Sequence, residues 1–502
     1  MGIVQRDSFS ITIIAYVGAV IGFINKLFLF TNFLTTEQVG LANLLITIAM
    51  LYTQFAAIGS YNTINKYFPF FNNQHKHHHG FLFGISALAL AGFIISTLLF
   101  LVLRKPFQWH FEANSPLLVE YMPYLIPLAL ATLYYNIFDT YLRSLYYNII
   151  PSLTYEVILR IFVTLSISLF AIGWVDFKTF VAIYVIANCL PAVIVILYTW
   201  YIRQLMLKPM YTLHWKRLGS IMVVYGLFSM MNNLSGLFTM SIDSLMVARM
   251  IDLSAAGIYT TMIFITSVLI IPYRSMIKVS TPLISNYWKE RALDKMEDLY
   301  TRATASNLVV GSGLFLMLWI NIDSILYFMP GEYATGKYVF LMLGIGKLFD
   351  MASGLNSVIL ATSKKYRYDL IFTVGLVVFT IITNYFFIRL FGMNGAALAS
   401  MITIVLFNLI RIWFISYHFN LQPFRTKQLW VPAILLVCMM LSAAIQQVYN
   451  VFVDLVVRST IIGLLFVIPL YFLHISEDIN KMARKNILWV WRWIRKDRLH
   501  KQ

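Results

Sequence analysis

The stretch SFSITIIAYVGAVIGFINKLFLF, residues 8–30, decides what kind of protein this is. Among its residues Lys26 is the only charged side chain. A helix needs roughly 20 mostly apolar residues to cross the hydrocarbon core of a bilayer. The stretch is also longer than the apolar part of a secretory signal peptide, and only a short polar segment precedes it. We therefore predict a membrane-spanning helix that stays in the membrane.

The composition of the whole chain supports a membrane protein. Of its 502 residues, 60% are apolar and 12% are charged, whereas soluble domains have about 45–50% and about 25%. In water such a chain would expose large apolar patches. A soluble enzyme, a nucleic-acid-binding domain and a secreted disulfide scaffold are therefore excluded. Cys189 and Cys438 both lie inside apolar runs, so we expect neither a disulfide framework nor a thiolate metal cluster.

Continuous apolar runs of spanning length occur fourteen times, separated by polar breaks. Strands of a membrane barrel would alternate apolar and polar residues, and these runs do not. The prediction is an all-α polytopic membrane protein with about 14 transmembrane helices. The predicted spans are 8–30, 39–60, 80–103, 119–142, 150–172, 178–202, 218–241, 254–277, 304–328, 337–361, 368–390, 394–416, 429–448 and 455–475.

The distribution of Lys and Arg predicts the orientation. With fourteen spans, 24 of these residues fall on the side of the N-terminus and seven on the opposite side. Cytoplasmic loops carry the excess of positive charge, so both termini are predicted to be cytoplasmic. An odd number of spans would place the basic C-terminal tail on the outer side of the membrane, against this rule.

The two halves of the chain resemble each other at an offset of 217 residues. Gly40 then aligns with Gly257, and Lys26 with Asp243. Repeated six-span bundles are a transporter design, with the substrate site between the repeats near the bilayer midplane. We therefore predict two pseudo-symmetric six-helix lobes with two additional helices. The predicted divisions are an N-terminal lobe (1–210), a C-terminal lobe (211–420), helices 13 and 14 (421–476) and a basic, Trp-rich cytoplasmic tail (477–502).

Three short motifs are similar to passages of a known transporter family. They are Ser241-Ile-Asp-Ser-Leu-Met246 followed by Ala256-Gly-Ile-Tyr259, Thr281-Pro-Leu-Ile-Ser285 running into Leu299-Tyr-Thr-Arg302, and Gly392-Met-Asn-Gly-Ala-Ala-Leu-Ala399. With the predicted topology, they resemble the multidrug/oligosaccharidyl-lipid/polysaccharide (MOP) exporter superfamily. Within it, the chain looks most like a bacterial polysaccharide transporter of the O-antigen flippase type.

This resemblance implies a location in the bacterial cytoplasmic membrane and a secondary transporter that works by alternating access. The implied substrate is an undecaprenyl-diphosphate-linked oligosaccharide, such as an O-antigen, capsule or exopolysaccharide unit. A proton or sodium gradient would drive its movement, without another cofactor. The resemblance also implies a monomeric transport unit, working near glycosyltransferases or a polymerase of the same pathway.

Three alternative functions remain open. A multidrug/cation antiporter of the same superfamily would have an acidic cavity, whereas the charged residues in the predicted spans of this chain are more often basic than acidic. The sequence alone distinguishes a lipid II flippase poorly from a flippase for lipid-linked oligosaccharides. A membrane-bound polysaccharide polymerase or ligase would carry its catalytic residues in a long outer loop. The longest outer loop predicted here, 104–118, is too short for such an active site, so we predict that the chain is not an enzyme.

Charged residues inside spans are the candidate site residues, because a charge at the bilayer centre costs about 2.5–3.5 kcal/mol on insertion scales. A lipid diphosphate is anionic, and Lys or Arg can neutralise it. Asp243 is a candidate for binding the coupling ion or for pairing with Lys26. The candidate substrate-binding or ion-coupling residues are Lys26, Asp243, Arg274, Lys347, Asp350, Asp139 and Arg143.

Some of these charges have a structural alternative. Asp139 with Arg143, and Glu156 with Arg160, are four residues apart on one helical face. We interpret both pairs as salt bridges near the cytoplasmic interface. Arg411 has no acidic neighbour in sequence, and we interpret it as an interfacial anchor.

Three further motifs are given structural interpretations. The stretch 331–338 resembles a phosphate-binding loop, but Tyr338 replaces the metal-binding hydroxyl, and no strand precedes it. The histidine tract 75–79 is read as a solvated cytoplasmic loop, so no metal site is predicted. The tail from 484 to 501 is read as an amphipathic helix on the anionic inner leaflet rather than a nucleic-acid-binding segment.

Overall fold

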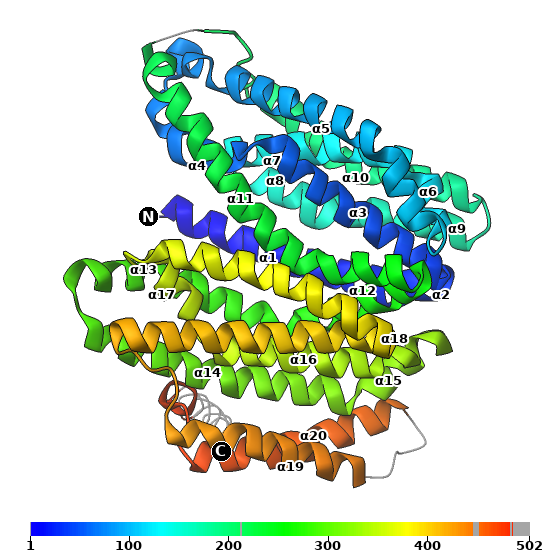
Figure 1. Cartoon of the computed structure of the whole chain (residues 1–502), viewed down its shortest axis with the longest axis vertical. Coiled ribbons are helices and arrows are strands. Elements are labelled where there is room, and N and C mark those ends of the chain that lie inside the picture. The colour runs from blue at the N-terminus through cyan, green and yellow to red at the C-terminus, as the bar shows by residue number, and fades with distance from the viewer. Residues whose placement is uncertain (1, 211–212, 445–450, 482–483, 485–502) are drawn as a thin grey trace, which may run out of the picture. The chain divides into compact units, whose positions relative to one another are not determined.

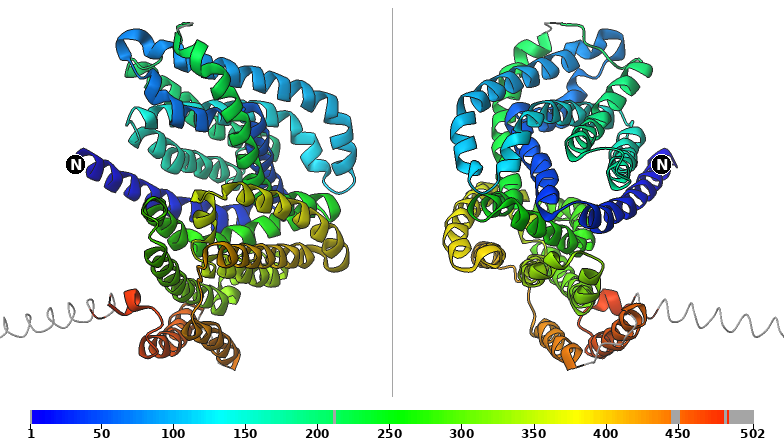
Figure 2. Two further views of the ribbon diagram at one scale, coloured as in Figure 1. Left: turned by 60° about the vertical axis from the view of Figure 1, so that its left-hand side comes forward. Right: turned by 90° about the vertical axis from the view of Figure 1, so that its right-hand side faces the viewer.

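The computed structural model describes residues 2–210, 213–444, 451–481 and 484 (Figure 1). Every regular element among these residues is a helix, which confirms the predicted all-α class. Apart from Arg484, the predicted amphipathic tail lies outside the described residues. The helices form two compact units, residues 1–261 and 262–502. Within each unit, long helices run side by side (Figure 2).

The first unit includes a helix that we assigned from sequence to the C-terminal lobe. Helix α11 packs against α3 and α4, and the division at residue 210 remains a sequence prediction. The elements of this unit are α1 (Gly2–Ile24), η1 (Asn25–Leu29), α2 (Phe30–Phe33), α3 (Thr36–Ala57), α4 (Ser60–Phe71), η2 (Gln74–Gly80), α5 (Phe81–Glu112), α6 (Pro116–Tyr121), η3 (Met122–Tyr124), α7 (Leu125–Ser144), α8 (Ile149–Leu153), η4 (Thr154–Ile158), α9 (Leu159–Ala171), α10 (Phe177–Tyr201), α11 (Leu213–Met250) and the first part of α12 (Leu253–Ser267).

The second unit begins within α12. Its further elements are η5 (Val268–Ile270), α13 (Ile271–Glu290), α14 (Leu293–Ile320), α15 (Ile322–Tyr327), η6 (Gly331–Gly336), α16 (Lys337–Ala352), α17 (Asn356–Thr362), α18 (Tyr366–Phe419), η7 (Thr426–Leu429), α19 (Trp430–Ala444) and α20 (Val451–Phe472).

The number of spans agrees with the sequence once two irregular helices are considered. Twelve helices in the described part of the chain are long and apolar enough to span, and the bent pair α16 and α17 makes thirteen. Helix α18 has 54 residues and reverses direction at Gly392, where φ is 59° and ψ is −137°. Its two halves pack against each other, since the Phe372 and Phe414 rings lie 5.4 Å apart. Counted as two spans, α18 accounts for both predicted runs, 368–390 and 394–416.

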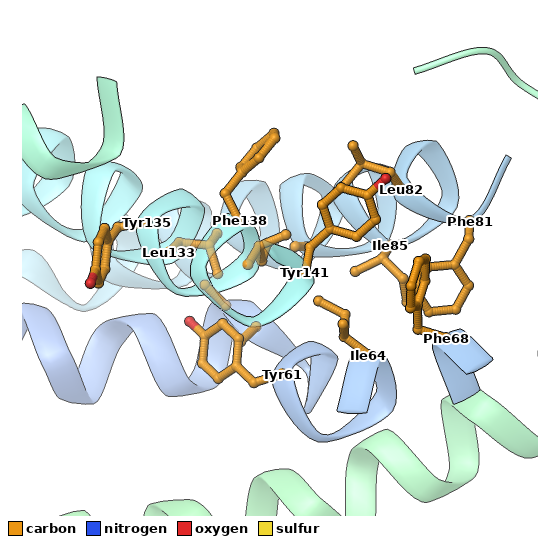
Figure 3. Close-up of a cluster of buried hydrophobic side chains, with 14 of the residues drawn as sticks. Tyr61, Ile64, Phe68, Phe81, Leu82, Ile85, Leu133, Tyr135, Phe138 and Tyr141 are labelled. Carbon is orange, nitrogen blue, oxygen red and sulfur yellow. The ribbon is translucent and has the colours of Figure 1, made fainter. Parts of the chain in front are cut away.

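Aromatic side chains form the core of the first unit. Phe68 of α4 packs edge-on against Phe81 of α5 and Tyr141 of α7, with ring centroids 5.5 and 5.2 Å apart. Figure 3 shows these rings pointing toward one another, together with aliphatic side chains of the same helices. By contrast, apolar residues such as Leu98 and Val102 of α5 are exposed. Exposed apolar helix faces are what a bilayer solvent requires.

In the second unit, the last helix is attached by buried polar contacts. Arg458 of α20 pairs with Asp454 at 3.4 Å and donates to the backbone oxygen of Ile320 at 3.4 Å. Asn321 also donates to Ser459 Oγ at 2.8 Å. Arg458 lies within the predicted span 455–475, and in the structure it is the eighth residue of α20, which begins at Val451.

Candidate functional site

Lys26 lies in a π-helical turn within the first span. This turn, η1, widens the helix between α1 and α2, and such turns are frequent at functional sites. Asn25 and Lys26 contact different helices. Asn25 Nδ2 donates to the backbone oxygen of Arg160 at 2.9 Å, whereas Lys26 Nζ donates to Asn43 Oδ1 of α3 at 2.6 Å.

Asn43 extends this contact to α12. It is 7% exposed, and its Nδ2 donates to Thr260 Oγ1 at 3.0 Å. Thr260 Oγ1 in turn donates to the backbone oxygen of Gly257 at 3.1 Å. A directed chain of hydrogen bonds therefore leads from the Lys26 ammonium to the backbone of α12.

Asp243 of α11 lies close to the end of this chain. It is 5% exposed and accepts a hydrogen bond from Tyr259, the residue before Thr260, at 3.2 Å. We call Lys26, Asn43, Tyr259, Thr260 and Asp243 the first network. The structure thus brings Lys26 and Asp243, which the repeat aligned, to one polar cluster.

The first network lies at a single depth. Lys26 is seven residues from the end of α2, and Asp243 is seven residues from the end of α11. Asn43 and Thr260 are each seven residues from the starts of their helices. At 1.5 Å per residue, each of these four residues is about 10 Å from the end of its helix on the side opposite the N-terminus.

A second cation lies near Lys26. Arg160 of α9 forms an ion pair with Glu156 at 2.7 Å, and its charge is close enough to act on that of Lys26. Its guanidinium lies against Gly22, where any side chain would crowd it. Arg160 is the twelfth residue of the span Ile149–Ala171. It therefore lies near the middle of this span and not at one of its ends, where we had placed the pair, whereas the ion pair itself is present as the spacing predicted.

Lys347 and Asp350 belong to a separate cluster in the second unit. Lys347 Nζ donates to Thr266 Oγ1 at 2.8 Å and not to Asp350, its neighbour on α16. Asp350 Oδ1 accepts from Asn408 Nδ2 at 3.0 Å, and Asn356 Nδ2 donates to Asn408 Oδ1 at 2.8 Å. We call Lys347, Thr266, Asp350, Asn356 and Asn408 the second network.

The second network surrounds a broken helix. The α16 axis bends by 51° before α17, and a bend leaves backbone carbonyls without helical partners. Asn307 Nδ2 donates to the oxygen of Met351 at 3.2 Å, and Tyr273 OH donates to that of Gly354 at 3.0 Å. Polar side chains are expected wherever irregular backbone lies at membrane depth.

Arg411 is not the isolated anchor that the sequence suggested. It pairs with Asp369 at 3.2 Å and donates to Thr373 Oγ1 at 3.1 Å. The reversal at Gly392 brings these residues together, although they are about 40 positions apart. Arg274 and Lys278 of α13 are exposed, and Arg274 is close enough to Lys347 to act on its charge.

Two other predicted groups lie near helix ends. Asp139 pairs with Arg143 at 2.9 Å, and Arg143, next to the last residue of α7, has a side chain 56% exposed. In the stretch resembling a phosphate-binding loop, Lys337 Nζ lies 2.7 Å from Asp323 Oδ1. That lysine is therefore engaged in an ion pair at the start of α16.

The histidine tract is only partly solvated, contrary to our expectation. His78 is 1% exposed, and its Nδ1 accepts from the backbone N–H of Asn73 at 3.1 Å. Its Nε2 lies 3.2 Å from Gln204 Oε1, and its ring packs against Phe68. Among the described residues there is no group of three or more His, Cys, Asp or Glu side chains suited to a metal ion.

The sequence reasoning missed the neutral members of both networks. Asn43, Thr260 and Asn408 escaped notice because we searched the spans for charges. One signal was available: at the offset of 217, Asn43 aligns with Thr260, so both repeats carry a polar side chain three residues after the aligned glycines.

The described part of the chain has the fold of a helical membrane protein with many spans. The structure is similar to that of a protein titled "Lipid II flippase MurJ, inward closed conformation", with a TM-score of 0.67, 14% identity, and 92% of this chain and 98% of that chain covered. It is also similar to an inward-facing multidrug resistance MATE family transporter of the MOP superfamily, at TM-score 0.59, 16% identity, and 81% and 94% coverage. A MOP superfamily transporter from Pyrococcus furiosus, whose title describes a reverse polarity of its binding pocket, matches at TM-score 0.56, 13% identity, and 83% and 95% coverage.

The sequence itself identifies the family. Residues 4–288, more than half of the chain, match the profile of the polysaccharide biosynthesis protein family. The chain therefore belongs to this family and has the fold of MOP-type transporters. No curated protein sequence matches it.

Proposed function

We propose that this protein moves an undecaprenyl-diphosphate-linked oligosaccharide across the bacterial cytoplasmic membrane by alternating access. One observation carries the proposal. The Lys26 ammonium lies inside a span, bound by the neutral amide of Asn43, and the Arg160 guanidinium lies against Gly22, about one helical turn before Lys26. Two cations at this depth suit a diphosphate, whose charge must cross hydrocarbon.

The chemistry of Lys26 supports exchange with a substrate. A hydrogen bond between an ammonium and a phosphate is charge-assisted on both sides and is stronger than one to a neutral amide. A diphosphate can therefore displace Asn43 from Lys26. Arg160 can add a bidentate contact once its pair with Glu156 rearranges.

Asp243 is the proposed site of the coupling proton or sodium ion. It is a buried carboxylate at the depth of Lys26, and Tyr259 fixes its orientation through a hydrogen bond. A change in its charge would act directly on the first network.

The test is movement of a lipid-diphosphate-linked oligosaccharide between leaflets of proteoliposomes, under an imposed proton or sodium gradient. We expect transport by the native chain and its loss in Lys26→Ala and Asp243→Ala, with folding intact. Native-like transport in both variants would contradict the proposed residues. Absence of lipid transport, with gradient-driven efflux of a cationic dye, would contradict the proposed substrate.

A lipid II flippase is a second candidate, favoured by the similarity to a structure with that title over 92% of this chain. Both substrates carry the same lipid diphosphate and differ in the group attached to it. Comparing lipid II with a lipid-linked oligosaccharide in the same assay separates the two functions.

A further inference from the structure

Helices α3 and α12 cross at two glycines near the helix ends opposite the N-terminus. A side chain on Gly40 would collide with the backbone oxygen of Leu253, and one on Gly257 would collide with that of Thr36. The hydroxyl oxygens of Thr36 and Ser254 also lie 2.6 Å apart. The two helices therefore pack with backbone against backbone at this point.

The contacts at this crossing are reciprocal, and they follow the offset of 217 residues that relates the two halves of the sequence. Each glycine faces the carbonyl four residues before the other glycine. Thr36 and Leu253, Gly40 and Gly257, and Asn43 and Thr260 are all 217 positions apart. Equivalent positions of two repeats contact each other in this way near a pseudo-two-fold axis. Two helices on such an axis separate when the repeats rotate apart.

The hydrogen-bond chain from Lys26 ends at this crossing. The Thr260 hydroxyl donates to the carbonyl of Gly257, so its lone pairs are left to accept from Asn43 Nδ2. This fixes the Asn43 amide with its oxygen toward Lys26. Chains of hydrogen bonds polarise one another, so the charge on Lys26 strengthens the bond between α3 and α12.

We propose that Asn43 couples occupancy of Lys26 by a phosphate group to opening of the α3–α12 crossing. This inference rests on the proposed function. A phosphate draws the ammonium away from Asn43 Oδ1, and the bond from Asn43 to Thr260 then loses its polarisation. Asn43 is a positioning residue, acting between the substrate cation and the helix crossing without contact to substrate.

The experiment measures closure of the crossing directly. In the full-length protein, Cys189 and Cys438 are replaced by serine, and Thr36→Cys with Ser254→Cys places two thiols at the crossing. The rate of disulfide formation is measured in neutral-lipid vesicles with and without undecaprenyl diphosphate. Binding of this lipid is measured separately, with Lys26→Met as the reference for lost binding.

Two adjacent threonines supply a matched control. The hydroxyls of Thr260 and Thr261 both donate to the Gly257 carbonyl, but the structure gives a bond to Asn43 for Thr260. We expect the lipid to slow cross-linking about threefold, the size of one neutral hydrogen bond. Thr260→Val is expected to remove the response while Lys26 keeps its bond to Asn43 and its lipid binding, whereas Thr261→Val keeps the response.

Three results would overturn the inference. Equal responses of Thr260→Val and Thr261→Val would show that the chain through Asn43 has no part in closure. Unchanged cross-linking in the otherwise native chain, with Lys26-dependent lipid binding intact, would remove the coupling and leave the proposed function standing. Absence of Lys26-dependent binding would overturn the proposed function, and the coupling with it.

Discussion

The two polar networks each contain a lysine and a buried or half-buried carboxylate, but they have different surroundings. In the first unit, Lys26 is linked through Asn43 to a crossing of two helices. In the second unit, Lys347 and Asp350 precede the bend between α16 and α17. The second network thus lies beside a helix break, whose Met351 and Gly354 carbonyls accept hydrogen bonds from Asn307 and Tyr273, and the first lies where two helices meet.

This difference assigns the networks different roles. Polar groups at a helix break reduce the energy of unpaired carbonyls, which is a sufficient structural reason for them. Near Lys26 the π-helical turn is the only irregularity in the described part of the span Ile13–Phe33. We therefore expect changes in the first network to affect transport and changes in the second to affect stability.

The largest expected effect is the loss of Lys26. Lys26→Met should lower the initial rate of lipid transport about tenfold to a hundredfold, because a hydrogen bond to a charged group contributes about 1.5–3 kcal/mol. Lys347→Met should leave the rate within about threefold of the native rate, less than the contribution of a bond to a charged group, because Lys347 donates to Thr266 beside a helix break and has no proposed contact with substrate. Both rates are measured at equal protein content and orientation in proteoliposomes. The reverse order would place the substrate site in the second unit.

The second comparison concerns the carboxylates Asp243 and Asp350 and the response of transport to an imposed ion gradient. Asp243→Asn keeps an acceptor for Tyr259 but cannot exchange a proton or bind a cation as a carboxylate does. Its transport rate should no longer respond to an imposed gradient, whereas Asp350→Asn should respond as the native chain does. Transport is measured at several gradient sizes. A gradient response retained by Asp243→Asn would exclude Asp243 as the coupling site.

Stability should show the opposite order. Asn408→Leu leaves Asp350 and Asn356 without their partner, and an unsatisfied buried polar group costs about 1–3 kcal/mol. In detergent, its midpoint of thermal unfolding should fall further than that of Thr260→Val, which leaves one neutral side chain, Asn43, without its partner. Equal losses in the two variants would remove the distinction between the networks.

The smallest effect is expected at Asp139 and Arg143. Their ion pair lies at the end of α7 with the arginine side chain 56% exposed, and exposed pairs contribute about 0–1 kcal/mol. Asp139→Asn should leave the transport rate within experimental error and change stability by less than about 1 kcal/mol. A strong loss of transport would return this pair to the substrate path.

Much of the fold was predictable because the bilayer imposes it locally. A run such as 8–30 must form a helix, since unpaired backbone groups are too costly in lipid. The candidate site was predictable only in part. Lys26 was found because charges in spans are rare, and Asp243 because the repeat aligns it with Lys26, but the partner of Arg411, Asp369, was missed because the two residues are distant in sequence.

The sequence by itself determined the helical class, the number of spans and the aligned pairs Lys26 with Asp243 and Gly40 with Gly257. Composition and the length of apolar runs are local properties, and they are sufficient for the class and the spans. The aligned pairs follow from the offset between the two halves of the sequence. Only the tertiary structure decided that Lys26 binds Asn43, that Thr260 leads to the glycine crossing, and that Lys347 belongs to a helix break. Hydrogen bonds between side chains depend on distances of about 3 Å between different helices, and no local property of the chain specifies which helices meet.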